Sequence, residues 1–276
     1  MHKLSVIKDK LTLYLILLLS TMLLMFSIKQ CSSPIEKNER YIRAGGDTIN
    51  VAIEISPLSL SMSSDTISGF YYDVLNLIAD KCDVKFKLHQ FVPLNFALDK
   101  LNEGLFDIVV ADIPSTTSLK AEYLLTEPLF VDHQVLVQRK NKLTGDPAIS
   151  NLHKLAYDSI WVVKNSPFKE RISNLTEELG CDTIYVIESE NYSSEQLLIL
   201  TALGEIKQAV VNANTAKAMI CDYPQLDVNT QISFNQFQVW VLRKDNKELC
   251  SRFNDWIKVV KETDEFRQLE IKYIKK

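Results

Sequence analysis

A segment that occurs twice constrains the fold of this 276-residue chain more than any other feature. Residues 101–113 read LNEGLFDIVVADI, and residues 201–214 read TALGEIKQAVVNAN. Each copy contains a helix end, a turn glycine, a short apolar strand and a polar loop, which we expect at 112–118 and at 212–215. Helices are expected at 168–179 and 194–203. An apolar run this short and this rich in β-branched residues, bounded by turn residues, is typical of a buried parallel strand. A doubled βα unit of this length predicts two similar lobes and a ligand cleft between them.

A second pair of matching segments indicates how the lobes are joined. Residues 134–140 read QVLVQRK and residues 238–244 read QVWVLRK, so one lies before and one after the second copy of the unit. Two matching strands, one entering and one leaving a lobe, are what a hinge crossed twice by the chain requires. We therefore expect 48–138 to form the first part of lobe 1, 139–235 to form lobe 2, and 236–276 to return to lobe 1.

The N-terminal 30 residues resemble a targeting segment. Three lysines precede an uninterrupted apolar stretch at 11–28, and Cys31 follows closely. This order is that of a secretory signal, and the cysteine at its end resembles the lipidation site of a bacterial lipoprotein. The apolar stretch also just reaches transmembrane length, so an uncleaved anchor is the alternative. Either version makes 31–47 a flexible tether and places the remaining chain outside the cytoplasm, attached to a membrane.

Composition excludes some classes of function. The chain is 46% hydrophobic and 24% charged, which is ordinary for a globular protein, and its formal net charge is −4. A mildly acidic chain without a run of Lys and Arg argues against nucleic acid as a partner. The four remaining cysteines show no metal-ligand spacing, and their pairing stays open: Cys82, Cys181, Cys221 and Cys250.

Catalysis finds little support in the sequence. There is no GxSxG, no HExxH and no phosphate-binding loop. The histidines after the signal segment are not spaced for a metal pair: His89, His133 and His153. We expect no catalytic residue, no metal and no cofactor.

The residues then resemble a known family, the bacterial extracellular solute-binding proteins of family 3, the polar amino-acid type. The resemblance covers about residues 48–276 and rests on Gly69-Phe70-Tyr71-Tyr72-Asp73, on 104–117, on Glu127-Pro128-Leu129-Phe130, on the twin strands and on the final helix. It implies an α/β, two-lobed periplasmic-binding-protein fold of type II, with the cleft between lobes joined by two hinge strands. Within this group, 161–168 and 195–206 are most similar to the non-catalytic N-terminal domain of membrane-bound lytic transglycosylase F.

The resemblance also implies that the ligand site is altered. In amino-acid binders of the family, an arginine clamps the ligand carboxylate and a second-lobe aspartate meets the ammonium group. The corresponding positions here are Leu119 and Asn212, and a small residue of the family is replaced by Asp112. Because an unpaired buried charge is costly, a free α-amino acid is an unexpected ligand. A neutral, hydroxyl-rich or cationic molecule, a peptide or a cell-wall fragment fits better, unless Lys120 replaces the arginine.

The candidate ligand-binding residues lie at the strand ends and loops that should face the cleft. For each one the alternative is that the side chain only caps a helix. The candidates are Leu58, Ser59, Asp112, Ser115, Thr116, Thr117, Asn165, Ser166, Asn212 and Asn214.

Three functions remain open. The first is a membrane-tethered, monomeric binding protein that closes over a small ligand and delivers it to an ABC-type permease. The second is a sensor or regulatory module whose closure is read by a cell-wall enzyme or a signalling partner. The third is a free-standing relative of a lytic enzyme that binds peptidoglycan fragments without cleaving them.

Overall fold

The computed structural model describes residues 48–275, apart from 64–65, 146, 148 and 181–182, together with Thr21. The expected signal segment, the tether and Cys31 lie outside the described residues, as does Cys181. Within the described part of the chain, no helix combines the length and the apolar character needed to cross a bilayer. There the three cysteines Cys82, Cys221 and Cys250 are free thiols.

The first sheet has the strand order β4-β1-β5-β13-β6, and β7 also pairs with β13. Strand β1 runs parallel to β4 and β5, whereas β13 runs antiparallel to β5, β6 and β7. The strands are β1 (Thr48–Glu54), β4 (Lys85–Phe91), β5 (Ile108–Pro114), β6 (Tyr123–Leu125), β7 (Phe130–Asp132) and β13 (Gln236–Arg243).

The second sheet repeats this arrangement. Its order is β10-β9-β11-β8-β12, with β9 parallel to β10 and β11, and β8 antiparallel to β11 and β12. The order β10-β9-β11-β8 therefore matches β4-β1-β5-β13 strand by strand, which confirms the two-lobed α/β fold expected from the doubled segment. The strands are β8 (Gln134–Arg139), β9 (Ser159–Val163), β10 (Tyr185–Ser189), β11 (Gln208–Asn212) and β12 (Leu226–Gln231).

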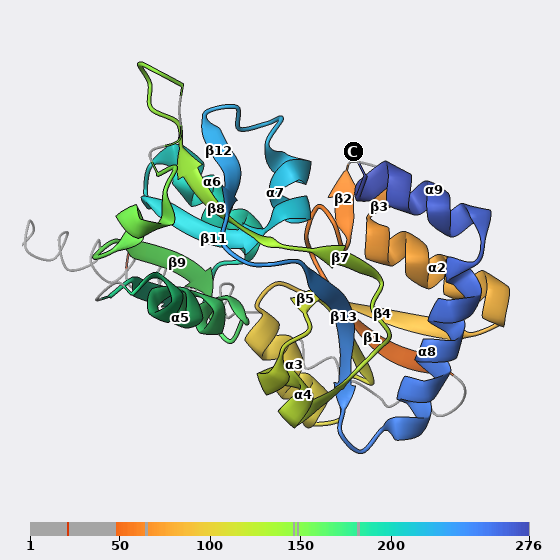
Figure 1. The fold of residues 1–276 in the computed structure, drawn as a ribbon. Helices are drawn as coiled ribbons and strands as arrows, with labels where there is room; N and C mark the ends of the chain where they lie inside the picture. The colour runs from red at the N-terminus through yellow and green to blue at the C-terminus, as the bar shows by residue number, and fades with distance from the viewer. Residues whose placement is uncertain are drawn as a thin grey trace, which may run out of the picture. The chain divides into compact units, whose positions relative to one another are not determined.

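Helices cover both sheets (Figure 1). In the first lobe, α2, α8 and α9 pack against one another, while α3 contacts β4, β5 and β13. In the second lobe, α5 lies on one face of the sheet, and α6 and α7 lie on the other. The helices are α2 (Phe70–Cys82), α3 (Leu94–Asn102), α4 (Thr117–Glu122), α5 (Phe168–Leu179), α6 (Ser194–Leu203), α7 (Ala213–Met219), α8 (Lys247–Lys261) and α9 (Asp264–Tyr273), with a 3-10 turn at Leu152–Leu155 and a hairpin of β2 (Ser61–Ser63) and β3 (Thr66–Ser68).

An aromatic cluster forms the centre of the first lobe. Trp240 on β13 is fully buried, and its ring contacts those of Tyr71 and Phe253 edge to face. The ring of Phe70 contacts Phe130 in the same way. Large rings in these orientations contribute strongly to a core, because each buries a large area. The cluster therefore fixes α2 and α8 against β13, which is one of the two strands that lead from lobe to lobe.

One arginine per lobe explains why the doubled segment and the twin strands occur together. Arg243, at the end of β13, donates through Nη1 to the carbonyls of Leu101 and Phe106 at 3.2 and 2.8 Å. Arg139, at the end of β8, donates to the carbonyls of Thr201 and Ile206 at 2.7 and 3.2 Å. Each guanidinium thus binds one carbonyl in the last turn of a helix and one in the segment that follows it, and a cation is stabilising at a helix C-terminus.

The glycine in each copy supplies the backbone conformation of this turn. Gly104 and Gly204 both have positive φ, at 79° and 88°, as a left-handed helix end requires. A Cβ atom at Gly204 would lie 3.2 Å from Nη1 of Arg139. The glycine and the arginine of each lobe are therefore parts of a single turn-closing unit.

The two connections between the lobes run beside each other (Figure 1). The N–H of Ile232 donates to the carbonyl of Gln134 at 2.8 Å, and the N–H of Gln134 donates to Oγ of Ser233 at 2.8 Å. Strand β8 pairs wholly within the second sheet, so the first crossing lies at His133, between β7 and β8. We expected residues 134–138 in lobe 1, but they pair in the sheet of lobe 2. In that sheet β8 occupies the position that β13 occupies in the first sheet.

Two segments expected to be polar loops contain regular structure. Residues 112–114 continue β5, and α4 begins at Thr117 inside the expected loop 112–118. Asn212 is the last residue of β11, and α7 begins at the next residue. Both helices have seven residues or fewer, so their polar first turns resemble loops in the sequence.

Candidate functional site

The cleft is built from strand ends of the first lobe and from β11, α6 and α7 of the second. Because β1 and β5 are adjacent and parallel, Glu54 at the end of β1 lies near Asp112 on β5. Across the cleft, Asn212 ends β11, and Ser193 caps α6 with a reciprocal capping box that includes Gln196. The cleft therefore brings two carboxyl groups of one lobe against amides and hydroxyls of the other.

Asp112 connects the lobes directly. Its Oδ2 accepts a hydrogen bond from Oγ1 of Thr215 at 3.0 Å, and its carbonyl accepts one from Nδ2 of Asn212 at 3.0 Å. Burial raises the pKa of Asp112 well above its ordinary value, and the charge of Asp132 raises it further. Asp112 thus holds the second lobe through its side chain and its backbone at the same time.

Glu54 is the second carboxyl group of the cleft. Burial raises its pKa from 4.5 to about 7, although hydrogen bonds, including that from Oγ of Ser59 at 3.3 Å, act in the opposite direction. The neighbouring charge of Glu195 raises the pKa as well. Burial also raises the pKa of Glu195 itself. Ionised carboxylates are therefore costly in this cleft unless a cation accompanies them.

Asp132 and Tyr71 extend this electronegative region behind Asp112. Asp132 is 3% exposed, and its two oxygens accept hydrogen bonds from the backbone N–H groups of His133 and Asn214 at 2.8 and 3.0 Å. Burial raises the pKa of Asp132. Burial and the charge of Asp112 raise the pKa of the Tyr71 hydroxyl. Each of these acids therefore opposes the ionisation of its neighbours.

An unsatisfied acceptor lies in the same wall. Asn212 is 2% exposed, and its Oδ1 is buried with no hydrogen-bond partner among the described residues. Although Asn212 occupies the N-cap position of α7, its side chain does not cap that helix. Buried polar atoms are rarely left unpaired, so this oxygen requires a hydrogen-bond donor that the described residues do not supply.

The central hollows are small. One of about 20 Å³ is lined by Glu54, Ser56, Asp112, Ser193, Ser194, Glu195, Asn212 and Thr215. A neighbouring hollow of about 30 Å³ shares four of these residues and adds Ser166 and Phe168. Volumes of this size hold one or two water molecules and are too small for an organic ligand. The lobes are therefore closed on each other, and no Lys, Arg or His lines either hollow.

The remaining sequence candidates lie around the edge of this centre. Leu58 and Asn214 line a larger pocket beside α7, and Asn165 lines a hollow that also contains Leu119. Ser115, Thr116 and Thr117 line a further hollow against α5. The structure thus brings Asp112, Ser166 and Asn212 together in the central hollows, whereas the candidates named above lie in hollows around them.

Two of the candidates have clear local roles. Thr116 caps α4, since its Oγ1 accepts the N–H of Leu119 at 3.2 Å. Ser59 is fully buried and orients Glu54 through its hydroxyl. The loop that carries Leu58 and Ser59 is held by α2, because the N–H of Phe70 donates to the Leu58 carbonyl at 2.6 Å. Gly69 permits this close approach, as a Cβ there would lie 2.3 Å from the Ser59 carbonyl oxygen.

Several residues of the site were not among the sequence candidates, including Glu54, Glu195, Asp132 and Thr215. Glu54 carried a detectable signal, because it is a charged residue at the end of the apolar strand Ile49–Ile53, next to the strand of Asp112. Asp132 is the last residue of β7, a strand of three residues that is too short to show periodicity. Thr215 was counted in a polar loop, although it belongs to α7 and faces Asp112.

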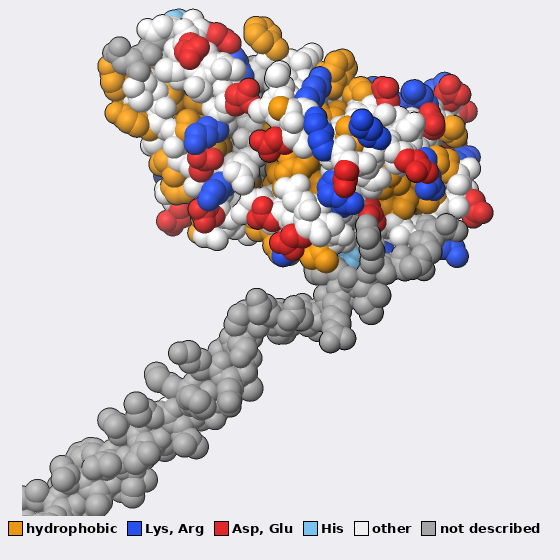
Figure 2. All heavy atoms as spheres, turned by 90° about the horizontal axis from the view of Figure 1, so that it is seen from below, with side chains coloured by type: hydrophobic (Ala, Val, Ile, Leu, Met, Phe, Trp, Pro, Cys, Tyr) orange, Lys and Arg blue, Asp and Glu red, His pale blue; other side chains and the backbone are white. Residues whose placement is uncertain are grey.

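The outer surface differs from the cleft. In Figure 2, acidic and basic side chains are interspersed on the face shown, without a large area of one sign. The ion pairs of the second lobe are mostly exposed, such as Lys164 with Glu190 and Lys169 with Glu188. The concentration of buried acids is therefore a property of the cleft.

Comparison with known proteins gives a family and a fold. The family model of bacterial extracellular solute-binding proteins, family 3, matches residues 48–276. Among solved structures, an ancestral arginine-binding protein bound to arginine superposes with a TM-score of 0.70 at 19% identity, covering 83% of this chain and 99% of that chain. The substrate-binding protein of an amino acid ABC transporter gives 0.67 at 20% identity, covering 83% and 100%.

Curated relatives are longer proteins. The membrane-bound lytic murein transglycosylase F of Shewanella woodyi is 25% identical over 184 residues, which are 66% of this chain and 36% of the relative. The protein of the same name from Shewanella sp. strain ANA-3 is 24% identical over 224 residues, covering 81% and 45%. The chain thus spans less than half the length of these relatives.

Proposed function

The chain belongs to family 3 of the bacterial extracellular solute-binding proteins, and from this premise we propose that it is a membrane-tethered, extracytoplasmic binding protein whose two lobes close over a small cationic ligand. The role is binding and delivery to an ABC-type permease, not catalysis. A free α-amino acid is not the preferred ligand in this proposal.

The acidic cleft carries the proposal. Glu54, Asp112 and Glu195 line the central hollow together with the unpaired Oδ1 of Asn212, and no basic side chain lines it. An ammonium group supplies both the missing charge and the missing donor. At 4 Å and an effective dielectric constant near 20, each carboxylate attracts such a group by about 4 kcal/mol before the cost of desolvation. Carboxylates that are costly alone are thus stabilised by the ligand.

The same charges disfavour a carboxylate-bearing ligand in the centre. Leu119, at the position of the family's clamping arginine, lies in a separate hollow with Asn165 and carries no charge. A ligand carboxylate placed between Glu54 and Asp112 would meet two like charges without a partner. An unpaired buried charge costs several kcal/mol, which is enough to prevent binding of a small molecule.

A second candidate function is a ligand-sensing or muropeptide-binding module. The observation that favours it is the name of the curated relatives, which are membrane-bound lytic murein transglycosylases. In this alternative, closure of the lobes is read by a cell-wall enzyme, and the ligand is a peptidoglycan fragment bearing an amine.

The test is a titration calorimetry panel with the full chain at pH 8. L-leucinamide and agmatine carry ammonium or guanidinium groups without a carboxylate, L-leucine carries both charges, and a purified amine-bearing muropeptide represents the alternative. We expect leucinamide or agmatine to bind at least about tenfold more tightly than leucine. Preferential binding of the muropeptide would support the second function instead.

Variants connect the result to the cleft. Glu54→Gln and Asp112→Asn should each weaken cation binding by about tenfold, because each removes one carboxylate from the hollow. Glu177→Gln on the exposed face of α5 removes a charge of the same kind outside the cleft and should leave affinity unchanged. Leucine binding as tightly as leucinamide, or equal effects of all three variants, would contradict the proposal.

A further inference from the structure

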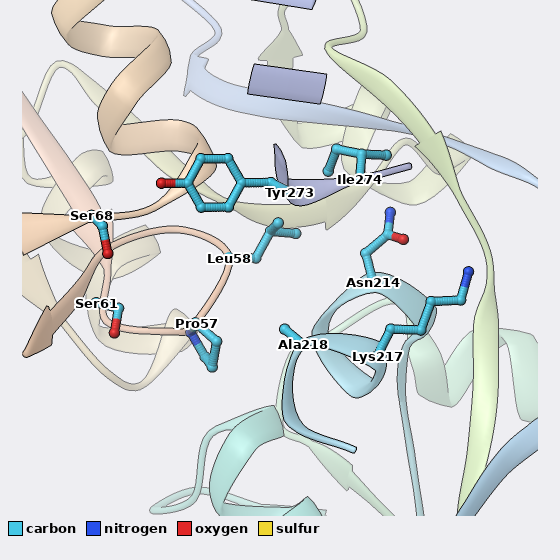
Figure 3. Close-up of a pocket in the computed structure, with 9 residues that line it drawn as sticks. All are labelled: Pro57, Leu58, Ser61, Ser68, Asn214, Lys217, Ala218, Tyr273 and Ile274. Carbon is cyan, nitrogen blue, oxygen red and sulfur yellow. The ribbon is translucent and has the colours of Figure 1, made fainter. Parts of the chain in front are cut away.

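The largest of the hollows that touch α7 lies outside the acidic centre. It measures about 210 Å³ and is enclosed by the β2–β3 hairpin, the end of α9 and one side of α7 (Figure 3). Its polar residues are Ser61, Ser68, Asn214 and Lys217, and Leu58 and Ile274 contribute apolar surface. Residues of both lobes therefore form its wall.

Asn214 gives this pocket a built polar group. The residue is only 6% exposed, and its backbone N–H is fixed by Oδ2 of Asp132 at 3.0 Å. Its side-chain amide makes no hydrogen bond to any described residue, yet it lines the pocket. A buried amide that opens only onto a cavity is satisfied by water or by a ligand.

Lys217 supplies the charge of the pocket. It is the single charged residue of the lining, and its ammonium forms no ion pair within the described part of the chain. Figure 3 shows this ammonium and the Asn214 amide on the same side of α7. The ammonium interacts electrostatically with the nearby carboxylate of Asp132, but the two groups form no ion pair, so the ammonium can still pair with an anion from outside.

Next to the hairpin serines, part of the wall is apolar and formed by Tyr273 and Leu58. The hydroxyl of Tyr273 donates to Oδ2 of Asp73 at 2.8 Å and accepts the N–H of Gly69 at 3.2 Å, so its ring is held at the edge of the pocket. Leu58 is 1% exposed and lies beside this ring. An apolar wall facing donors suits a small apolar body that carries an anionic head, whereas free phosphate lacks such a body.

We propose that this pocket is a second binding site, which takes the carboxylate of a small ligand with an apolar body through Lys217 and Asn214. Its chemistry is opposite to that of the acidic cleft, so the two sites select different ligands or different ends of one ligand. Because both lobes form the wall, occupancy favours the closed arrangement and increases affinity at the cleft. This coupling rests on the proposed function, but the site itself does not.

The test uses N-acetyl-L-leucine, which has a carboxylate and no ammonium group, and its neutral analogue N-acetyl-L-leucinamide. Titration of the full chain followed by NMR should show saturable binding of the acid and about fivefold weaker binding of the amide. Inorganic phosphate should not compete. Equal binding of acid and amide, competition by phosphate, or no saturation by the acid up to about 10 mM would overturn the proposal.

Matched variants separate this site from the cleft. Lys217→Met should weaken binding of N-acetyl-L-leucine by about fivefold, and Lys217→Arg should retain most of it. Lys258→Met, at an exposed position of α8, is the control and should have no effect. Glu54→Gln should impair leucinamide binding but leave N-acetyl-L-leucine bound. If the acid binds and Lys217→Met has no effect, the second site is refuted while the cleft proposal is still tested by leucinamide.

Discussion

Replacing Glu54 by glutamine should make the protein more stable above neutral pH and leave it nearly unchanged in acid. The pKa of Glu54 is raised from 4.5 to about 7 in the folded protein, chiefly because the side chain is buried. Between these two values the native state binds more protons than the unfolded state. The free energy of unfolding therefore falls as the pH rises from about 4.5 to about 7, and it levels off above that range.

The size of the stability difference follows from the change in the pKa of Glu54. A difference of about 2.5 pKa units corresponds to about 3 kcal/mol at pH 8, and water entering an opened cleft makes this an upper bound. Glutamine has the same shape, retains an acceptor for the Ser59 hydroxyl and carries no charge. The stability difference between Glu54→Gln and wild type should thus be near zero at pH 4.5 and reach about 1–3 kcal/mol in favour of glutamine at pH 8.

Urea denaturation of both proteins between pH 4.5 and pH 8.5 measures this difference. Asp112 and Asp132 also titrate in the wild type, but they remain in the variant, so subtraction isolates the contribution of Glu54 and its coupling to them. Glu177→Gln should give a difference that does not depend on pH. A flat difference for Glu54→Gln, or a less stable variant at pH 8, would refute the assignment of Glu54 as a buried acid.

Two further predictions concern the lobes. Arg139→Met and Arg243→Met should each lower the free energy of unfolding by about 1–3 kcal/mol in urea denaturation, because each removes two hydrogen bonds that a guanidinium donates to backbone carbonyls. Arg267→Met, which removes an exposed pair, should cost less than about 1 kcal/mol. Equal effects would contradict the role of the turn-closing arginines. Thr215→Val removes a hydrogen bond between the lobes, so the population of open molecules, measured by small-angle scattering without ligand, should rise about fivefold. Ser118→Ala removes an exposed hydrogen bond to Glu170 and should change this population less. An unchanged scattering profile for both variants would show that neither bond holds the lobes closed.

The architecture could be predicted because local signals and the repeated pattern agree. Helix α6 occupies the predicted residues 194–203, since a capping box starts it and Gly204 ends it. Helix α5 likewise matches the predicted 168–179 and ends at Gly180. The doubled segment then predicts that the two lobes are similar. The structure shows why the segment occurs twice: in each copy an arginine binds the carbonyls at the end of a helix and just after it.

Short elements escaped prediction because tertiary contacts, not local sequence, stabilise them. Helix α4 has six residues and α7 has seven, which are too few to form helices on their own. Strand β12 has mixed burial and pairs only with β8, so its sequence alone shows no clear period. Asp132 belongs to the site for the same kind of reason, because β7 carries it there through pairing with β13.

The missed Glu54 changes the interpretation of the site. From the sequence, Asp112 is a single carboxylate at the rim of a cleft that has lost its arginine, and several ligand classes remain possible. With Glu54 and Glu195 beside it, and with Oδ1 of Asn212 unpaired opposite, the cleft requires positive charge to keep its carboxyl groups ionised. Protons supply that charge when the cleft is closed without a ligand. In the proposed function a bound cation replaces these protons, so we expect ligand binding to release protons as the lobes close.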